Sequence, residues 1–161
     1  MNMPNKLKWC AGLKDGLKIA EPNERLAKSY LEEAKLSLKR AEKDLVEGDL
    51  LWATVIIYYA EYYALYSFLQ RIGIKCENHF CSILAVENLL GKEKVKIINE
   101  QKLKRIDAQY YMKIVEKEKI HEMLNKGKIF VSEFDNIISS LTENEIKYYI
   151  NKFKNLLNKI R

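Results

Sequence analysis

Residues 50–69 read LLWATVIIYYAEYYALYSFL, and this run decides the fold class of the chain. It is long enough to cross a bilayer as a helix, but Glu61 lies near its middle and five of its residues are tyrosine. A carboxylate at the centre of a bilayer is costly, and tyrosine prefers the membrane interface. The run therefore predicts a helix that protein buries on nearly all sides, and we expect no membrane association.

The segment before this run predicts another helix, from about Glu24 to Glu47. Asn23 is a suitable N-terminal cap, and Gly48 supplies the stop. Alanine and leucine alternate along its apolar stripe at helical spacing: Ala27, Leu31, Ala34, Leu38, Ala41 and Leu45. Small side chains at every second position let a partner helix approach closely, so the stripe predicts one tightly packed face.

Cap residues outline further helices along the chain. The apolar run itself is one of these helices, capped by Asp49 and ending near Arg71. The others are a short helix from Asn78 to Gly91, a charged helix over about 93–108, and a last helix that opens with the Thr142–Glu145 capping box.

Between the charged helix and the last helix, apolar residues from Ile120 to Leu141 repeat at helical spacing. Gly127 lies inside this repeat, either as a cap between two helices or as a small residue at a close contact. The unbroken repeat favours one long helix.

Together these elements predict an all-α fold, an antiparallel helical bundle of four to five main helices. The chain has 161 residues, of which 48% are hydrophobic, enough for one buried core. Only two prolines and six glycines are present, which argues against a turn-rich β protein. We expect a single domain over residues 1–161, with residues 1–22 as a short N-terminal segment that docks through Trp9 and Leu13.

The net charge of +6 and the three cysteines indicate which partners and location to expect. The charge favours anionic partners, and segment 92–105 carries six basic residues against two acidic ones, although such runs are more often solvated faces. The odd cysteine count and the absence of a signal peptide in the first twenty residues predict reduced thiols in a cytoplasmic protein.

Two groups of residues have the composition of metal sites without the arrangement. Zinc ligands are available in Cys10, Cys76, His79 and Cys81. His79 and Cys81 are only two positions apart, however, and would face different ways on a helix. Glu118 and His121 have the spacing of a di-iron ligand pair, but no second pair accompanies them. We therefore expect buried thiols rather than zinc, and neither a metal nor a cofactor.

The apolar run carries polar groups that need partners. Glu61 requires a hydrogen-bond donor, which Arg105, a tyrosine hydroxyl or a lysine would supply. A buried network that fixes helix register is favoured over a polar group that lines a cleft. The tyrosines of the run recur at helical spacing: Tyr58, Tyr59, Tyr62, Tyr63 and Tyr66. This stripe predicts core or a subunit interface, and less often a base-stacking platform.

Residues 21–84, from EPNERLAKSY to NHFCSIL, followed by RIDAQYY at 105–111, resemble a HEPN domain. This is the higher eukaryote and prokaryote nucleotide-binding family, and the likeness is to its small archaeal stand-alone members. It covers roughly Trp9 to Leu157. The resemblance implies an antiparallel helical bundle that often forms a homodimer. Many relatives are encoded beside a minimal nucleotidyltransferase partner in toxin–antitoxin pairs, and active members are metal-independent ribonucleases.

The resemblance places Arg105 at the arginine of the family's ribonuclease motif, in which a histidine follows four to six residues later. Tyr110 and Tyr111 stand where that histidine belongs. Neither His79 nor His121 has the spacing to replace it. Tyrosine has a pKa of about 10 and is a poor base at neutral pH, whereas arginine alone binds phosphate without completing the reaction.

The motif region therefore predicts a structural or phosphate-binding cluster rather than a nuclease centre. We expect Asp107 to hold Arg105 in place and tyrosine hydroxyls to bond to either residue. Candidate catalytic residues are limited to Arg105, Asp107, Tyr110 and Tyr111. Candidate nucleotide or RNA contacts are Lys102, Lys104, Arg105 and Tyr111.

Three hypotheses of function compete. The favoured one is a non-catalytic or weakly active HEPN protein that binds nucleotide, RNA or a nucleotidyltransferase-like partner, as part of a toxin–antitoxin pair. Such a partner would find candidate acceptors for modification in Tyr110 and Tyr111. The first alternative is a metal-independent toxin endoribonuclease with an atypical motif, in which a tyrosine or aspartate replaces the histidine. The second is a scaffold that assembles with itself through the tyrosine-rich helix.

Overall fold

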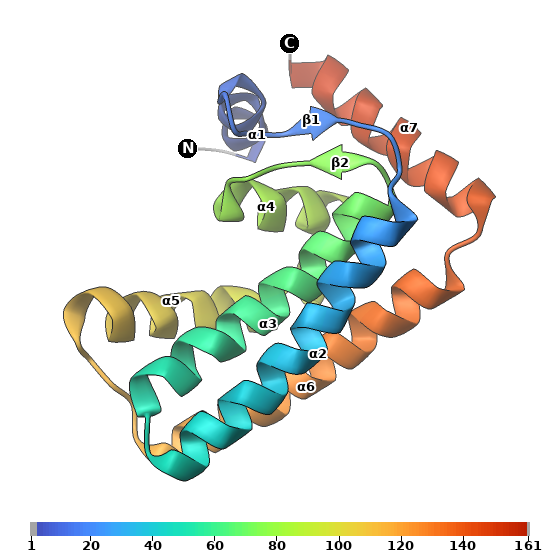
Figure 1. The fold of residues 1–161 in the computed structure, drawn as a ribbon. Coiled ribbons are helices and arrows are strands. Elements are labelled where there is room, and N and C mark those ends of the chain that lie inside the picture. The colour runs from blue at the N-terminus through green and yellow to red at the C-terminus, as the bar shows by residue number, and fades with distance from the viewer. Residues whose placement is uncertain (1–2, 161) are drawn as a thin grey trace.

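The computed structural model describes residues 3–160 and confirms the all-α fold (Figure 1). In chain order the elements are α1 (Met3–Gly12), β1 (Lys18–Ile19), α2 (Glu24–Glu47), α3 (Leu50–Arg71), β2 (Ile74–Lys75), α4 (His79–Leu90), a 3₁₀ turn (Lys92–Val95), α5 (Lys96–Tyr111), α6 (Lys117–Ser140) and α7 (Glu143–Ile160). Within this described part, no helix combines the length and apolar character that a membrane crossing requires.

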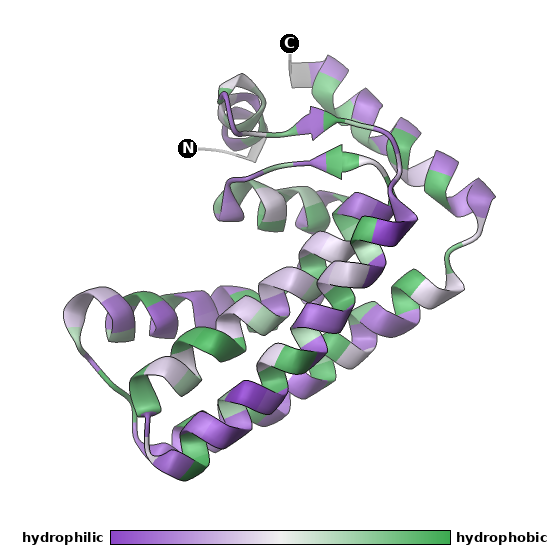
Figure 2. Ribbon diagram, in the orientation of Figure 1, coloured by the Kyte–Doolittle hydropathy of each residue, from purple (hydrophilic) through white to green (hydrophobic). Residues whose placement is uncertain are grey.

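The core lies where α2, α3 and α6 run side by side (Figure 1). The predicted Ala–Leu stripe of α2 is buried along its whole length. Figure 2 shows hydrophobic and hydrophilic residues alternating along α2 and α6, as expected of helices with one buried face. α3 is buried on most sides, as the apolar run predicts, and it also contacts α4 and α5.

Both ends of α2 and the start of α3 form where the sequence predicts them. Asn23 Oδ1 accepts the N–H of Leu26 at 2.9 Å, and Asp49 Oδ1 accepts the N–H of Trp52 at 3.2 Å. Between the two helices, Gly48 has a φ of 84°, a left-handed conformation that glycine adopts without strain. The predicted bounds of both helices are therefore confirmed.

α6 runs unbroken through Gly127, which confirms the single long helix. A Cβ atom at this position would lie 3.2 Å from Cγ2 of Ile57 on α3 and 3.4 Å from Cδ2 of Leu38 on α2. The missing side chain thus lets three helices meet at one point. The repeat of apolar residues outweighed the helix-breaking tendency of glycine because packing stabilises the helix there.

α5 differs from its prediction at both ends. Residues 92–95 form a 3₁₀ turn, and the helix continues beyond 108 to Tyr111. Met112 then stops the helix with a φ of 54°, and its N–H donates to the carbonyl of Asp107. No glycine marks this left-handed stop, so the sequence offered no signal for it.

The N-terminal segment contains two elements that the sequence did not predict. α1 packs against α4 and α7 and buries Leu7. β1 pairs with β2 in antiparallel fashion, with Lys18 opposite Lys75. Of the two expected docking residues, Trp9 contacts the ring of Phe80 edge-on, and Leu13 packs at the margin of the core.

Cys10 and Cys81 form a disulfide, which corrects the expectation of three reduced thiols. The two cysteines are 71 positions apart in the sequence, but the packing of α1 on α4 brings their Cα atoms to 5.5 Å. Cys76 is a buried free thiol. A cysteine count cannot reveal such a pairing, because the pairing depends on the fold. The cytoplasmic location stays a prediction.

Candidate anion-binding site

Arg105 lies on the side of α5 that packs against α3, and only 9% of it is exposed. Its guanidinium carbon is 4.6 Å from the ring centre of Tyr58 and 5.9 Å from that of Tyr59. Its Nη1 donates to Oε1 of Gln109 at 3.2 Å, one helical turn further along. Aromatic faces attract a guanidinium ion, so these two rings hold the cation in place without neutralising it.

His79 is the first residue of α4, and it contacts the same two tyrosines as Arg105. Its Nδ1 lies 2.9 Å from the hydroxyl of Tyr58, and its ring stacks on that of Tyr62 with centres 3.6 Å apart. His79 and Arg105 therefore contact the same aromatic wall, formed by the rings of Tyr58 and Tyr59. The histidine comes from α4 and the arginine from α5. The sequence did not predict this contact, because 26 positions separate His79 from Arg105 and the expected histidine follows the arginine closely.

Burial and two nearby positive charges keep the imidazole of His79 neutral. Burial, followed by the positive charges of Arg105 and Lys102, lowers the pKa of His79 from 6.5 to about 4. Burial also raises the pKa of Tyr58 to about 12, against the opposing effect of Arg105, so its hydroxyl keeps its proton. The bond between His79 and Tyr58 consequently joins two neutral groups at pH 7.

Lys102 brings a second cation to the site, one turn before Arg105 on α5. Its Nζ lies 5.2 Å from the ring centre of Phe80, which follows His79 in α4. Burial and the charge of Arg105 lower the pKa of Lys102. Neither Lys102 nor Arg105 forms an ion pair with a carboxylate within the described residues. Two partly buried cations without an acidic partner form a site that favours an anion.

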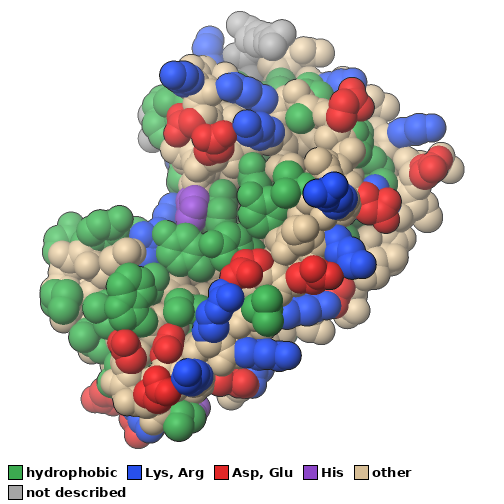
Figure 3. All heavy atoms as spheres, in the orientation of Figure 1, with side chains coloured by type: hydrophobic (Ala, Val, Ile, Leu, Met, Phe, Trp, Pro, Cys, Tyr) green, Lys and Arg blue, Asp and Glu red, His purple; other side chains and the backbone are tan. Residues whose placement is uncertain are grey.

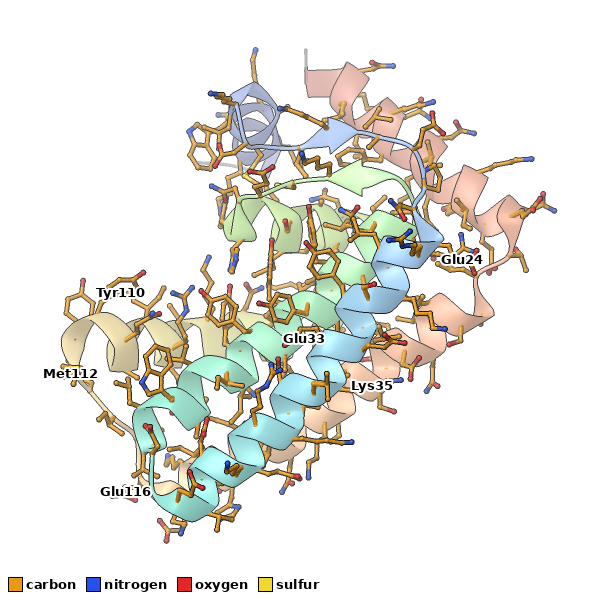
Figure 4. All side chains as sticks on the ribbon, in the orientation of Figure 1. Glu24, Glu33, Lys35, Tyr110, Met112 and Glu116 are labelled. Atoms are coloured by element: carbon orange, nitrogen blue, oxygen red, sulfur yellow. A yellow bond between two sulfur atoms is a disulfide. The ribbon has the colours of Figure 1, made fainter. Side chains whose placement is uncertain are left out.

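The predicted cluster of Arg105, Asp107 and Tyr111 does not form. Asp107 is exposed, and Gln109 takes the place that Asp107 was expected to fill beside Arg105. Tyr110 and Tyr111 are 67% and 66% exposed in the last turn of α5. Figure 4 shows Tyr110 and Met112 at the tip of this helix. Residues two positions apart on a helix face different sides, which explains why Asp107 cannot support Arg105.

Glu61 is fully buried but is separated from the site. Both of its carboxylate oxygens lack a hydrogen-bond partner among the described residues, so none of the expected donors reaches it. It faces α6, where a Cβ on Gly127 would lie 3.5 Å from its Oε1. Burial raises the pKa of Glu61 well above 4.5, since the charged form would lose its hydration.

Two other lysines of the basic segment, Lys94 and Lys104, interact with acidic residues of α6 and α3. Lys94 pairs with Glu133 of α6, and Lys126 of α6 pairs with Glu100. The positive charge of Lys104, a predicted contact for RNA, partly offsets the effect of burial on the pKa of Glu61. Glu133 thus neutralises one cation of the segment, and Lys102 and Arg105 are its cations on the α3–α4 side.

No group of three metal-ligating side chains comes together within residues 3–160. The residues considered for zinc point to other partners, since Cys81 is bonded to Cys10 and His79 to Tyr58. Glu118 and His121 are both exposed on α6.

A groove beside the site extends the aromatic surface across α2 and α3. A pocket of about 220 Å³ is lined by Arg40, Trp52, Ile56, Tyr59 and Tyr63, among others. Tyr59 belongs both to this groove and to the wall under Arg105. Figure 3 shows hydrophobic side chains along this hollowed flank, with a histidine at its inner corner. The half-exposed rings offer faces on which planar groups can stack.

Comparison with protein families supports the resemblance seen in the sequence. The family model described as the HEPN domain matches residues 27–160, most of the chain. A search of curated proteins finds no match. The matched residues include α3, α4 and α5, which carry the site, and leave out α1 and β1. The family model covers most of the chain, and the all-α fold is the one expected of this family. The chain therefore belongs to the HEPN domain family.

Proposed function

We propose that the protein binds RNA or a nucleotide through a phosphate group at the site of Arg105, Lys102 and His79. The observation that carries the proposal is the position of Arg105, held over Tyr58 and Tyr59 with no ion pair to a carboxylate of residues 3–160. The HEPN family is related to nucleotides and RNA, which agrees with an anionic ligand. The net charge of +6 attracts such a ligand over a longer range.

The ligand would use the cations and the aromatic groove together. Phosphate oxygens accept hydrogen bonds from Arg105 and Lys102, and from Nε2–H of His79 when the Tyr58 hydroxyl donates to Nδ1. A neighbouring base stacks on the half-exposed ring of Tyr59. A ligand with both phosphate and base therefore fits better than inorganic phosphate.

A metal-independent ribonuclease is the second candidate, and the position of His79 and Arg105 on the same tyrosine, Tyr58, favours it. In the other tautomer Nδ1–H donates to Tyr58, and Nε2 carries a lone pair. Nε2 then takes the proton of an RNA 2′-hydroxyl, and the 2′-oxygen attacks the adjacent phosphorus. The bond from phosphorus to the 5′-oxygen breaks, a proton from water completes the leaving hydroxyl, and a 2′,3′-cyclic phosphate remains. Arg105 and Lys102 would stabilise the extra negative charge at phosphorus.

The partners proposed for the chain are a second copy of itself and a minimal nucleotidyltransferase, as in a toxin–antitoxin pair. Large hydrophobic side chains are exposed along α5 and in the loop after it: Leu103, Tyr110, Tyr111, Met112 and Ile114. Such a patch is typical of an interface between proteins. Tyr110 and Tyr111 are accessible there, as acceptors of a nucleotide from the partner must be. A scaffold that only assembles with itself would use the same patch.

The deciding experiment measures binding and cleavage of a fluorescent single-stranded oligouridylate in EDTA. Arg105→Ala should weaken binding about tenfold or more, because a charge-assisted hydrogen bond to phosphate is lost. The exposed Arg25→Ala, which removes the same charge elsewhere, is the matched control. Equal affinity of Arg105→Ala and the control would reject the site. Cleavage that stops at a cyclic phosphate, and that disappears in His79→Ala and on a deoxy oligonucleotide, would establish the ribonuclease instead.

A further inference from the structure

The N-terminal segment lies outside the residues that match the family, yet it is attached at the edge of the candidate site. The match begins at residue 27, whereas α1 and β1 precede it. The disulfide from Cys10 ends at Cys81, two residues after His79. The N-terminal segment is therefore bonded covalently to the first turn of the helix that presents the histidine.

Backbone hydrogen bonds hold the residues just before His79 to the same segment. β1 pairs with β2, and the N–H of Glu77 donates to the carbonyl of Asp15 at 2.9 Å. Asn78 then caps α4 by accepting the N–H of Cys81 at 3.1 Å. Residues on both sides of His79 are thus fixed to a part of the chain that contributes no group to the site itself.

A line of side chains connects α1 with the cations. The ring of Trp9 lies edge-on to that of Phe80, with centres 6.1 Å apart. Lys102 also contacts Phe80, since its Nζ is 5.2 Å from the centre of the same ring. Phe80 directly follows His79 in the chain and contacts Lys102 through its ring. Trp9 therefore supports the residue that connects the histidine with the lysine.

We infer that residues 3–19 act as a clamp, bonded through Cys10–Cys81, that positions His79 and Lys102 for the anionic ligand. Trp9 and Phe80 are positioning residues, since they act through His79 and Lys102. The inference rests on the proposed function for its effect on binding, whereas its effect on His79 is independent of any ligand. Loss of the clamp frees the first turn of α4 and lets water reach the imidazole.

The main test compares Cys10→Ser with Cys76→Ser, which removes the buried thiol that takes no part in the bond. Both proteins are measured well below their melting temperatures, with circular dichroism to show that they are folded. Cys10→Ser should bind the oligouridylate about tenfold more weakly, the effect of one lost charge-assisted hydrogen bond. NMR titration of the ring of His79 should give a pKa nearer the value of an exposed histidine. A folded Cys10→Ser protein with unchanged affinity and unchanged His79 titration would overturn the inference.

A second pair of variants keeps the disulfide and tests the line of side chains. Trp9→Ala should shift the His79 titration in the same direction, and Trp9→Phe should restore it, because phenylalanine still reaches Phe80. Equal titration curves in the wild type and Trp9→Ala would overturn the role of Trp9. If the wild type does not bind the oligonucleotide, the proposed function fails, and the His79 titration still decides whether the clamp exists.

Reduction gives an independent route to the same state. Dithiothreitol supplies two electrons and two protons, so that the disulfide becomes two thiols and the reagent leaves as its cyclic disulfide. Both sulfur atoms are buried, so unfolding in the reagent and refolding in its presence prepares the reduced protein. The reduced wild type should match Cys10→Ser, and reduced and oxidised forms with the same His79 titration would contradict the clamp.

Discussion

Nδ1 of His79 lies 2.9 Å from the hydroxyl of Tyr58, although 21 positions separate the two residues in the sequence. The ring of Tyr58 also carries the guanidinium of Arg105. One tyrosine of α3 therefore orients the histidine of α4 with its hydroxyl and the arginine of α5 with its face. The two functions of this side chain can be separated, because phenylalanine keeps the ring and loses the hydroxyl.

Tyr58→Phe should lower the free energy of unfolding by about 1 kcal/mol, because Nδ1 of His79 loses its partner while the contact with Arg105 remains. Urea unfolding measures this change, and NMR should show a shifted His79 ring resonance. Tyr148→Phe is the control, since Tyr148 is exposed on α7. Identical stability and an unmoved resonance in Tyr58→Phe would show that the hydrogen bond contributes nothing.

The wild type should lose stability in mild acid because of His79. The pKa of His79 is about 4 in the folded state and 6.5 in the unfolded state. Between these pH values the unfolded chain binds a proton at His79, whereas the folded chain does not. Stability is therefore lost as the pH falls from 6.5 towards 4, by about 1–2 kcal/mol after allowance for the partial exposure of the ring. Urea midpoints at pH 7 and pH 5 measure the loss, and His79→Gln should reduce it. An equal loss in His79→Gln would assign it to other groups.

Glu61→Gln should stabilise the protein at pH 8 by about 1–3 kcal/mol. The raised pKa means that folded Glu61 keeps its proton where the unfolded chain has released it. Wild-type stability therefore falls as the pH rises above 4.5, whereas the neutral amide avoids that loss. At pH 4 the two proteins should differ little. A less stable Glu61→Gln at pH 8 would mean that the carboxylate is ionised and paired.

Gly127→Leu should destabilise the protein by about 2 kcal/mol or more, because the added side chain overpacks the contact with Ile57 and Leu38. Thermal unfolding at pH 7 measures the effect. Gly12→Ala provides a contrast, since a Cβ there has no atom within 4 Å. Its stability should stay near that of the wild type. A Gly127→Leu protein of normal stability would show that α6 can move away from α2 and α3.

The parts of the fold that local chemistry determines could be predicted from the sequence. Asn23, Gly48 and Asp49 mark helix ends through bonds to nearby backbone, and the Ala–Leu stripe marks its own buried face. The clamp could not be predicted, because Cys10 and Cys81 meet only after α1 packs on α4.

The site was predictable only in part. Arg105 was found through the resemblance, but neither Asp107, which was expected to hold it in place, nor Glu61, to which it was expected to donate, is its partner. Its actual companion, His79, follows a predicted cap at Asn78, so its place at the start of a helix was foreseeable. That this helix end lies over Tyr58 depends on long-range packing of α4 against α3, which no spacing rule encodes.

The disulfide has a further consequence for the denatured chain. Residues from Cys10 to Cys81 form a closed ring that contains all of α2 and α3, with a short tail before Cys10 and a long one after Cys81. The unfolded protein is accordingly a ring with tails rather than a linear polymer. Such a chain is more compact than an open one, so the oxidised protein should migrate ahead of the reduced protein in a denaturing gel. The oxidised protein also exposes less new surface on unfolding than the reduced protein. Its free energy of unfolding should therefore fall less steeply with denaturant concentration.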